Sequence, residues 1–333
     1  MPVYRILTLD GGGQLEMTST LLLGEIEKKR PGFLAKTNLI AGTSAGAMVG
    51  LILATRDNPA DLLPATDKLW QDFFFLSMNS FAGAMLGLVG LGALFSNERL
   101  EQYLAQADLL GDKTLGDLKK RVLITAFNLD DKAQHTGHRI WKPKVFHNCG
   151  SHDEPDLEEK AVDVALRSGA SPIFFPAVDN YIDGGMFANH PAMAAVSQIL
   201  ADWRHGYSAG AEKPGVLEDL RVLSVGVGQD KEYADTGDGN WGYFNWVLNP
   251  FKPLLLLGAL MRGDSWAVNF ECKHVMPQGH YHRLDPYYIV NSYIPGMVDT
   301  AVIRKTVESD DTQKLIDRTV EWLDKCGWFE EGN

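Results

Sequence analysis

The sequence contains little cysteine and fewer basic than acidic side chains. Its three cysteines, Cys149, Cys272 and Cys326, are odd in number, far apart and without metal-site spacing, which favours free thiols in a reducing compartment. The 31 Lys and Arg residues against 43 Asp and Glu residues give a formal net charge of −12. Because nucleic acids and anionic membranes are bound through clustered basic side chains, this charge argues against nucleic acid and against a general electrostatic attraction to anionic membranes.

The sequence also lacks repeats, low-complexity tracts and the pattern of a secretory signal. From the N-terminus the chain enters the apolar segment Ile6–Leu9 directly, without a charged region followed by a hydrophobic one, so we expect a cytoplasmic protein. One segment departs from the acidic character, because residues 132–147 contain Lys, Arg and His but no acid. We interpret this segment as a solvated β-hairpin.

Apolar strands alternate with helical patterns along the chain, and several strands are wholly apolar. This order predicts an α/β fold, a three-layer sandwich whose mainly parallel central sheet is covered by helices on both faces. Since no linker divides the chain, we expect one domain over residues 1–333. Strands are expected at 3–9, 39–41, 121–128, 220–227 and 280–286, with a short strand running into a glycine turn at 180–185. Helices are expected at 17–29, 44–55, 60–75, 96–110, 158–168 and 189–203, followed by one or two closing helices over 299–326, with a hairpin around Thr136-Gly137 and Asn189 as a helix N-cap.

The segment Gly42-Thr43-Ser44-Ala45-Gly46 stands between an apolar strand and a small-residue helix. In a Gly-x-Ser-x-Gly turn of this kind, the serine takes a strained conformation that exposes its hydroxyl at the sheet edge. The serine then needs a base to accept its proton. A standard α/β-hydrolase places several strands before its nucleophile, whereas one strand precedes this unit here, so that fold is disfavoured.

A second glycine cluster, Gly11-Gly12-Gly13, follows the first strand directly. Backbone amides of closely spaced glycines can point at one position and stabilise an oxyanion there. The alternative is a dinucleotide-binding loop, but that fingerprint requires a third glycine where Glu16 stands. A carboxylate at this place repels a pyrophosphate, so we disfavour nucleotide binding.

Three motifs together resemble the signatures of the patatin-like phospholipase family, in the family's order: Asp10 to Gly13, Gly42 to Gly46, and Asp183-Gly184-Gly185. The segments SNERLEQYL, ALRSGASPIFFPAV, DGGMFANHPA, VLSVGVG and YHRLDP are similar to the family's connecting segments, so the resemblance covers nearly the whole chain. The resemblance implies hydrolysis of lipid esters by a Ser–Asp dyad without a metal or cofactor. Ser44 is then the nucleophile, Asp183 the base, and the amides of Gly11, Gly12 and Gly13 the oxyanion hole.

The sequence departs from the family at Gln14-Leu15-Glu16, where the family has a basic residue followed by glycine. This departure weakens the prediction of a phospholipid substrate more than the prediction of serine acyl hydrolysis. It leaves a non-catalytic or effector-sensing protein as the alternative. Among the nine histidines, His190 lies near the Asp183 turn and is the one to test; His274, His280 and His282 are expected in structural positions.

Residues 73–95 form a run of 23 residues without a charge, long enough to span a bilayer. Ser77, Asn79 and Ser80 interrupt the run, so three interpretations stand: a spanning helix, a buried helix, or a lid or acyl-binding wall that meets a lipid surface. We favour the lid or wall, with Trp246–Arg262 as the opposite wall. The expected partner is a lipid or phospholipid ester. We expect the cytoplasmic protein to reach this substrate through transient contact with a membrane surface.

Overall fold

The computed structural model describes residues 3–80, 83, 87, 90–132, 137–150, 156–211, 215–231, 233–249, 254–289 and 299–330. Its centre is a seven-stranded sheet in the order β4-β3-β2-β1-β6-β7, with β5 paired to β3. The strands are β1 Tyr4–Leu9, β2 Leu39–Thr43, β3 Arg121–Asn128, β4 Lys142–His147, β5 Tyr181–Asp183, β6 Leu220–Val225 and β7 Tyr281–Leu284.

Five consecutive strands of the sheet run parallel to one another: β3, β2, β1, β6 and β7. The other two strands, β4 and β5, both run antiparallel to β3. The α-helices among the described residues are α1 Glu16–Lys29, α2 Phe33–Lys36, α3 Ala45–Ala54, α4 Leu63–Ser77, α6 Glu98–Leu104, α7 Ala161–Ser168, α8 Gly185–Ala188, α9 Ala192–Arg204, α10 Leu255–Val275, α11 Thr300–Glu308 and α12 Asp310–Lys325. A short 3-10 helix, η1 Gly13–Leu15, precedes α1, and a π-helix, η5 Phe244–Leu248, precedes α10.

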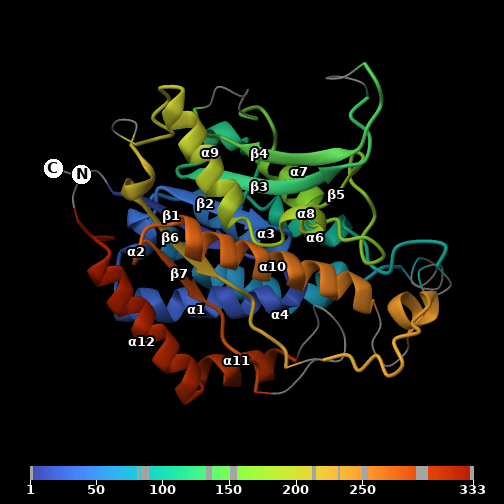
Figure 1. The fold of residues 1–333 in the computed structure, drawn as a ribbon. Coiled ribbons are helices and arrows are strands. Elements are labelled where there is room, and N and C mark those ends of the chain that lie inside the picture. Colours follow the sequence, from blue (N-terminus) through green and yellow to red (C-terminus); the bar gives the residue numbers. More distant parts are fainter. Residues whose placement is uncertain are drawn as a thin grey trace.

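Side chains of alternate strand residues enter two separate cores, one on each face of the sheet. Leu7 and Leu9 of β1 lie in the larger core, which also contains side chains of α1, α3, α4 and α12. Tyr4 and Ile6 lie in the smaller core, with side chains of α9 and α10. Figure 1 shows α9 and α10 lying across one side of the sheet and α1 and α4 on the other. The predicted α/β architecture, with a mainly parallel sheet and helices on both faces, is confirmed.

Several details differ from the sequence-based expectations. The helix expected to reach residue 110 ends at Leu104. Asn189 is not an N-cap, because it ends α8, and α9 begins at Ala192 after Pro191. The antiparallel pairing of β3 with β4 confirms the hairpin, whose tip at Thr136 lies outside the described residues.

The uncharged run at 73–95 begins inside α4, which ends at Ser77. Residues 81, 82, 84–86, 88 and 89 of the run lie outside the described residues, so the expected lid over 73–95 stays a prediction. Among the residues that are described, no helix has the length and apolar character needed to cross a bilayer.

Candidate active site

The register of three strands brings Ser44 and Asp183 together. β2 ends at Thr43, which lies opposite Thr125 of β3, and β5 ends at Asp183, which lies opposite Ala126. Because β4 occupies the other edge of β3 at these positions, β5 continues along the edge that β2 leaves. The carboxyl ends of β2 and β5 therefore meet. The Ser44 hydroxyl, which follows Thr43, donates a hydrogen bond of 2.6 Å to Asp183 Oδ2, so the expected contact is present.

Ser44 stands at a strained turn between β2 and α3. Its φ of 55° and ψ of −122° place a non-glycine residue in a sparsely populated backbone region. A Cβ on Gly42 would lie 2.5 Å from the Gly46 carbonyl oxygen, and one on Gly46 would lie 2.5 Å from the Asp10 carbonyl oxygen. Ser168, which sequence reasoning missed, accepts a hydrogen bond of 2.8 Å from the Ser44 amide. Close packing and this hydrogen bond hold the serine in the strained geometry.

The carboxyl group of Asp183 is buried, with 2% of the residue exposed. Desolvation raises its pKa from 3.8 to about 6, although hydrogen bonds from Ser44 and from the Gly185 amide act in the opposite direction. The Gly185 amide donates to Asp183 Oδ1 at 2.7 Å, which orients Oδ2 toward Ser44. A carboxylate with a pKa near the working pH is a better general base than an exposed one.

The glycine loop after β1 differs from expectation in one respect. The amide of Gly11 already donates a hydrogen bond of 3.0 Å to the Asn189 carbonyl oxygen, so it is not available to an oxyanion while this bond is kept. Within the described chain, the amides of Gly12 and Gly13 make no hydrogen bond. Gly13 has a φ of 58°, which glycine adopts without strain. Asn189 also donates from Nδ2 to the Gly11 carbonyl oxygen at 3.2 Å, so it holds Gly11 from both sides.

A cavity of about 770 Å³ contains the serine, the aspartate and the glycine loop. Volumes of this order are typical of ligand-binding sites. The uncharged run 73–95 contributes to its lining at the end of α4, and the largely apolar segment Trp246–Arg262 contributes at the start of α10. The apolar lining includes Met48, Phe73, Phe74, Phe95, Phe174, Phe175, Leu255, Leu257 and Met261.

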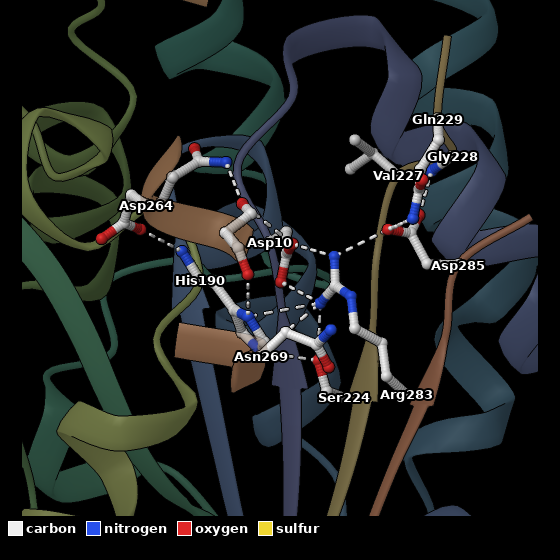
Figure 2. A network of polar contacts seen from close by, with 12 residues as sticks. Asp10, His190, Ser224, Val227, Gly228, Gln229, Asp264, Asn269, Arg283 and Asp285 are labelled. Atoms are coloured by element: carbon white, nitrogen blue, oxygen red, sulfur yellow. Dashed lines mark hydrogen bonds and ion pairs between the residues drawn. The ribbon is translucent and has the colours of Figure 1, made fainter. Parts of the chain in front are cut away.

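His190 belongs to a buried polar network beside the glycine loop, in which it contacts Ser224 (Figure 2). Its Nε2 and the Ser224 hydroxyl are 2.8 Å apart, and burial lowers its pKa. The centre of the network is Arg283, which pairs with Asp10 and Asp285. Sequence reasoning missed Arg283, although the YHRLDP segment contains it. The other three named histidines contact Phe270 (His274), Arg221 (His280) and Thr319 (His282).

The residues that the structure describes include no group of three or more His, Cys, Asp or Glu side chains placed to hold a metal ion.

Comparison with known proteins places these features in a family. Residues 7–196 match the family model described as patatin-like phospholipase. Protein teg of Priestia megaterium is 32% identical over 309 residues, covering 86% of this chain and 88% of its own. The putative sporulation hydrolase CotR of Bacillus subtilis is 29% identical over 332 residues, covering 92% and 93%. A cGAMP-activated phospholipase of Pseudomonas aeruginosa is 31% identical over 263 residues, covering 75% and 72%. The chain belongs to the patatin-like phospholipase family.

Proposed function

We propose that this protein hydrolyses carboxylic esters of lipids, with Ser44 as nucleophile and Asp183 as general base. Membership in the family supports lipid ester hydrolysis. The observation that carries the mechanism is the 2.6 Å hydrogen bond between Ser44 Oγ and Asp183 Oδ2, inside a cavity that also contains the amides of Gly12 and Gly13.

In the first half-reaction, Ser44 Oγ attacks the ester carbonyl carbon while its proton passes to Asp183. The negative charge that develops on the carbonyl oxygen is stabilised by the amides of Gly12 and Gly13, and each such donor is worth about 10²–10³ in rate. The bond to the leaving oxygen then breaks, and Asp183 returns the proton to the released alcohol or lysolipid. In the second half-reaction, Asp183 takes a proton from water, which attacks the acyl carbon. The bond from that carbon to Ser44 Oγ breaks, and Asp183 returns the proton to Ser44 Oγ as the fatty acid leaves.

The departure at Leu15 and Glu16 concerns the substrate more than the chemistry. Leu15 lines the cavity as an apolar side chain and Glu16 is fully buried, so neither residue places a positive charge in the cavity. A cation at this position is therefore not offered to a phosphate headgroup. We propose that the enzyme recognises the ester and its acyl chain without requiring the phosphate at this point.

A fluorophosphonate probe tests the assignment directly, because it labels only an activated serine. We expect labelling of the wild type, loss of labelling in Ser44→Ala, and strongly slowed labelling in Asp183→Asn. Ser96→Ala, a change beside the cavity-lining Phe95, is the matched control and should keep the label. A folded wild type that stays unlabelled and inactive on esters would favour the alternative, a non-catalytic or effector-sensing protein.

The cavity opens where exposed aromatic side chains border it. Phe74, Tyr233 and Trp266 line the cavity and are 56%, 79% and 56% exposed. Phe75 and Met78, adjacent to Phe74 at the end of α4, are 60% and 47% exposed. In Figure 1 the end of α4 and the start of α10 lie toward the same side of the molecule. Because aromatic and apolar side chains favour the membrane interface, we propose that this opening contacts a lipid surface.

Sedimentation with phosphatidylcholine vesicles tests this contact. The double change Phe75→Ser and Met78→Ser should weaken vesicle binding at least about tenfold, because each side chain buries apolar area worth about 1.5–3 kcal/mol. Hydrolysis of a soluble short-chain ester should be kept.

Tyr207→Ser is the control, because it removes an exposed aromatic side chain (42% exposed) at the other end of the sheet. Tyr207 is two residues from Ala209, whose carbonyl oxygen accepts a hydrogen bond from the Tyr4 hydroxyl at the amino end of β1. Equal vesicle binding by the double variant and the control would refute this surface while leaving the ester chemistry intact.

A further inference from the structure

One arginine connects the ends of three neighbouring strands beside the glycine loop. Arg283, on β7, binds both carboxylate oxygens of Asp10, with Nη1–Oδ1 at 3.2 Å and Nη2–Oδ2 at 2.7 Å (Figure 2). Asp10 directly follows β1 and directly precedes Gly11. The guanidinium also donates to Asp285 Oδ2 at 2.8 Å and to Ser224 Oγ of β6 at 2.8 Å.

Asp285 extends this contact to the loop that follows β6. Its carboxylate accepts hydrogen bonds of 2.9 Å from the Gly228 amide and 2.9 Å from Gln229 Nε2. The preceding residue, Val227, packs directly on the glycine loop, because a Cβ on Gly12 would come within 2.7 Å of Val227 Cγ2. Asp10 and Asp285 therefore attach two facing loops to the same guanidinium, and the Gly12 backbone lies against one of them.

The charges of this network are suited to holding geometry at the site. The side chains of Arg283, Asp10 and Asp285 are 10%, 3% and 8% exposed. Burial lowers the pKa of Arg283, but the two carboxylates outweigh it and raise that pKa overall, so the guanidinium stays charged. An unpaired carboxylate at Asp10 would stand beside the position where the oxyanion forms and would disfavour its negative charge.

We propose that Arg283 is a positioning residue that holds the Gly11–Gly13 loop against Val227 through its pairing with Asp10 and Asp285, in the geometry that receives the oxyanion. This inference rests on the proposed ester hydrolysis and adds to it a residue that touches neither Ser44 nor Asp183. The planar guanidinium of Arg283 is required for this role, because a lysine provides the charge but cannot bind two carboxylates in the same geometry.

The test compares Arg283→Lys with Arg5→Lys on a soluble ester. Arg5 lies on β1, is 8% exposed and donates to the carbonyl oxygens of Val3, Trp328 and Glu330. It is therefore a buried arginine near the amino end of β1, whereas Asp10 and the glycine loop follow the carboxyl end of that strand. Arg283→Lys should lower kcat about 10- to 100-fold, the effect of weakening an oxyanion donor, while KM changes less than about threefold. Both variants should lower Tm by similar amounts, but Arg5→Lys should keep the wild-type kcat.

Amide hydrogen exchange provides a readout that does not depend on activity. Exchange across residues 10–15 should speed up in Arg283→Lys and stay at the wild-type rate in Arg5→Lys. If Arg283→Lys does not fold, Asp285→Asn, which removes one half of the pairing, is measured in the same way.

Wild-type kcat in a folded Arg283→Lys, or unchanged exchange at residues 10–15, would overturn the proposal. Absence of Ser44-dependent hydrolysis in the wild type would instead refute the proposed function, while the exchange measurement would still decide whether Arg283 orders the loop.

Discussion

Replacing Asp183 by asparagine should change activity and stability in opposite directions. Burial raises the pKa of this carboxyl from 3.8 to about 6, a shift of about 2 units, which corresponds to about 3 kcal/mol. Only the ionised form can accept the Ser44 proton. For the wild type, kcat/KM should therefore be half-maximal near pH 6 and fall about tenfold for each pH unit below it. Asp183→Asn should lose at least about 10²-fold in kcat/KM and lose this pH dependence.

The stability effect follows from the same shift. Between the unfolded pKa of 3.8 and the folded pKa of about 6, the folded protein keeps a proton that the unfolded chain releases, so stability falls as the pH rises through this window. Asparagine does not titrate. Relative to the wild type, the variant should therefore gain up to about 3 kcal/mol between pH 4 and pH 8. Thermal unfolding of both proteins at the two pH values measures this gain.

A matched control is Asp202→Asn, which changes a fully buried carboxyl on α9 that accepts a hydrogen bond from Gln198. This variant should keep the wild-type pH profile of kcat/KM. A wild-type kcat/KM that is constant between pH 5 and pH 8, or an Asp183→Asn variant with the wild-type rate, would refute the role of Asp183 as base.

Four further changes have defined outcomes. Ser44→Gly should abolish fluorophosphonate labelling yet raise Tm, because glycine adopts the φ of 55° without strain and gains about 1 kcal/mol; a lower Tm would contradict this. Gly12→Ala should reduce kcat at least about tenfold and destabilise by about 1–3 kcal/mol, since its Cβ meets Val227 at 2.7 Å, and urea unfolding measures the second effect. Ser168→Ala should lower kcat and cost about 1–3 kcal/mol, because the buried Ser44 amide loses its acceptor; an unchanged rate would show that the turn holds without it. Glu16→Gln should be stabilised relative to wild type at pH 8 but not at pH 4, because burial raises the pKa of Glu16 well above 4.5 and the wild type loses stability as the unfolded chain ionises.

Local patterns in the sequence predicted the elements that carry the site. The apolar run before Gly42 and the small residues after Gly46 predicted β2 and α3, and the turn between them holds Ser44 in the expected strained position. The turn at Asp183 was equally readable, because two consecutive glycines follow the short strand directly. Such features depend on a few consecutive residues, so periodicity and glycine placement are sufficient to indicate them.

Asn189 shows where local reasoning fails. Its position before Pro191 is typical of an N-cap, but its side chain instead contacts Gly11, which is 178 residues away in the chain. The backbone carbonyl oxygen of Asn189 accepts a separate hydrogen bond from the Gly11 amide, which leaves the amides of Gly12 and Gly13 for the proposed oxyanion hole. No nearby residue signals this hydrogen bond, because it forms only when α8 packs beside the loop after β1.

The sequence by itself determined the strands, the turns and the residue types available for chemistry, because these follow from short-range backbone preferences and from the burial of apolar side chains. Only the tertiary structure decided which of those residues touch. Ser44 and Asp183 are 139 residues apart and meet because β2 and β5 share one edge of β3 in a particular register. Arg283 reaches Asp10 across 273 residues because β7, β6 and β1 lie side by side. Strand register and the pairing of distant charges depend on packing of the whole chain, which no local pattern encodes.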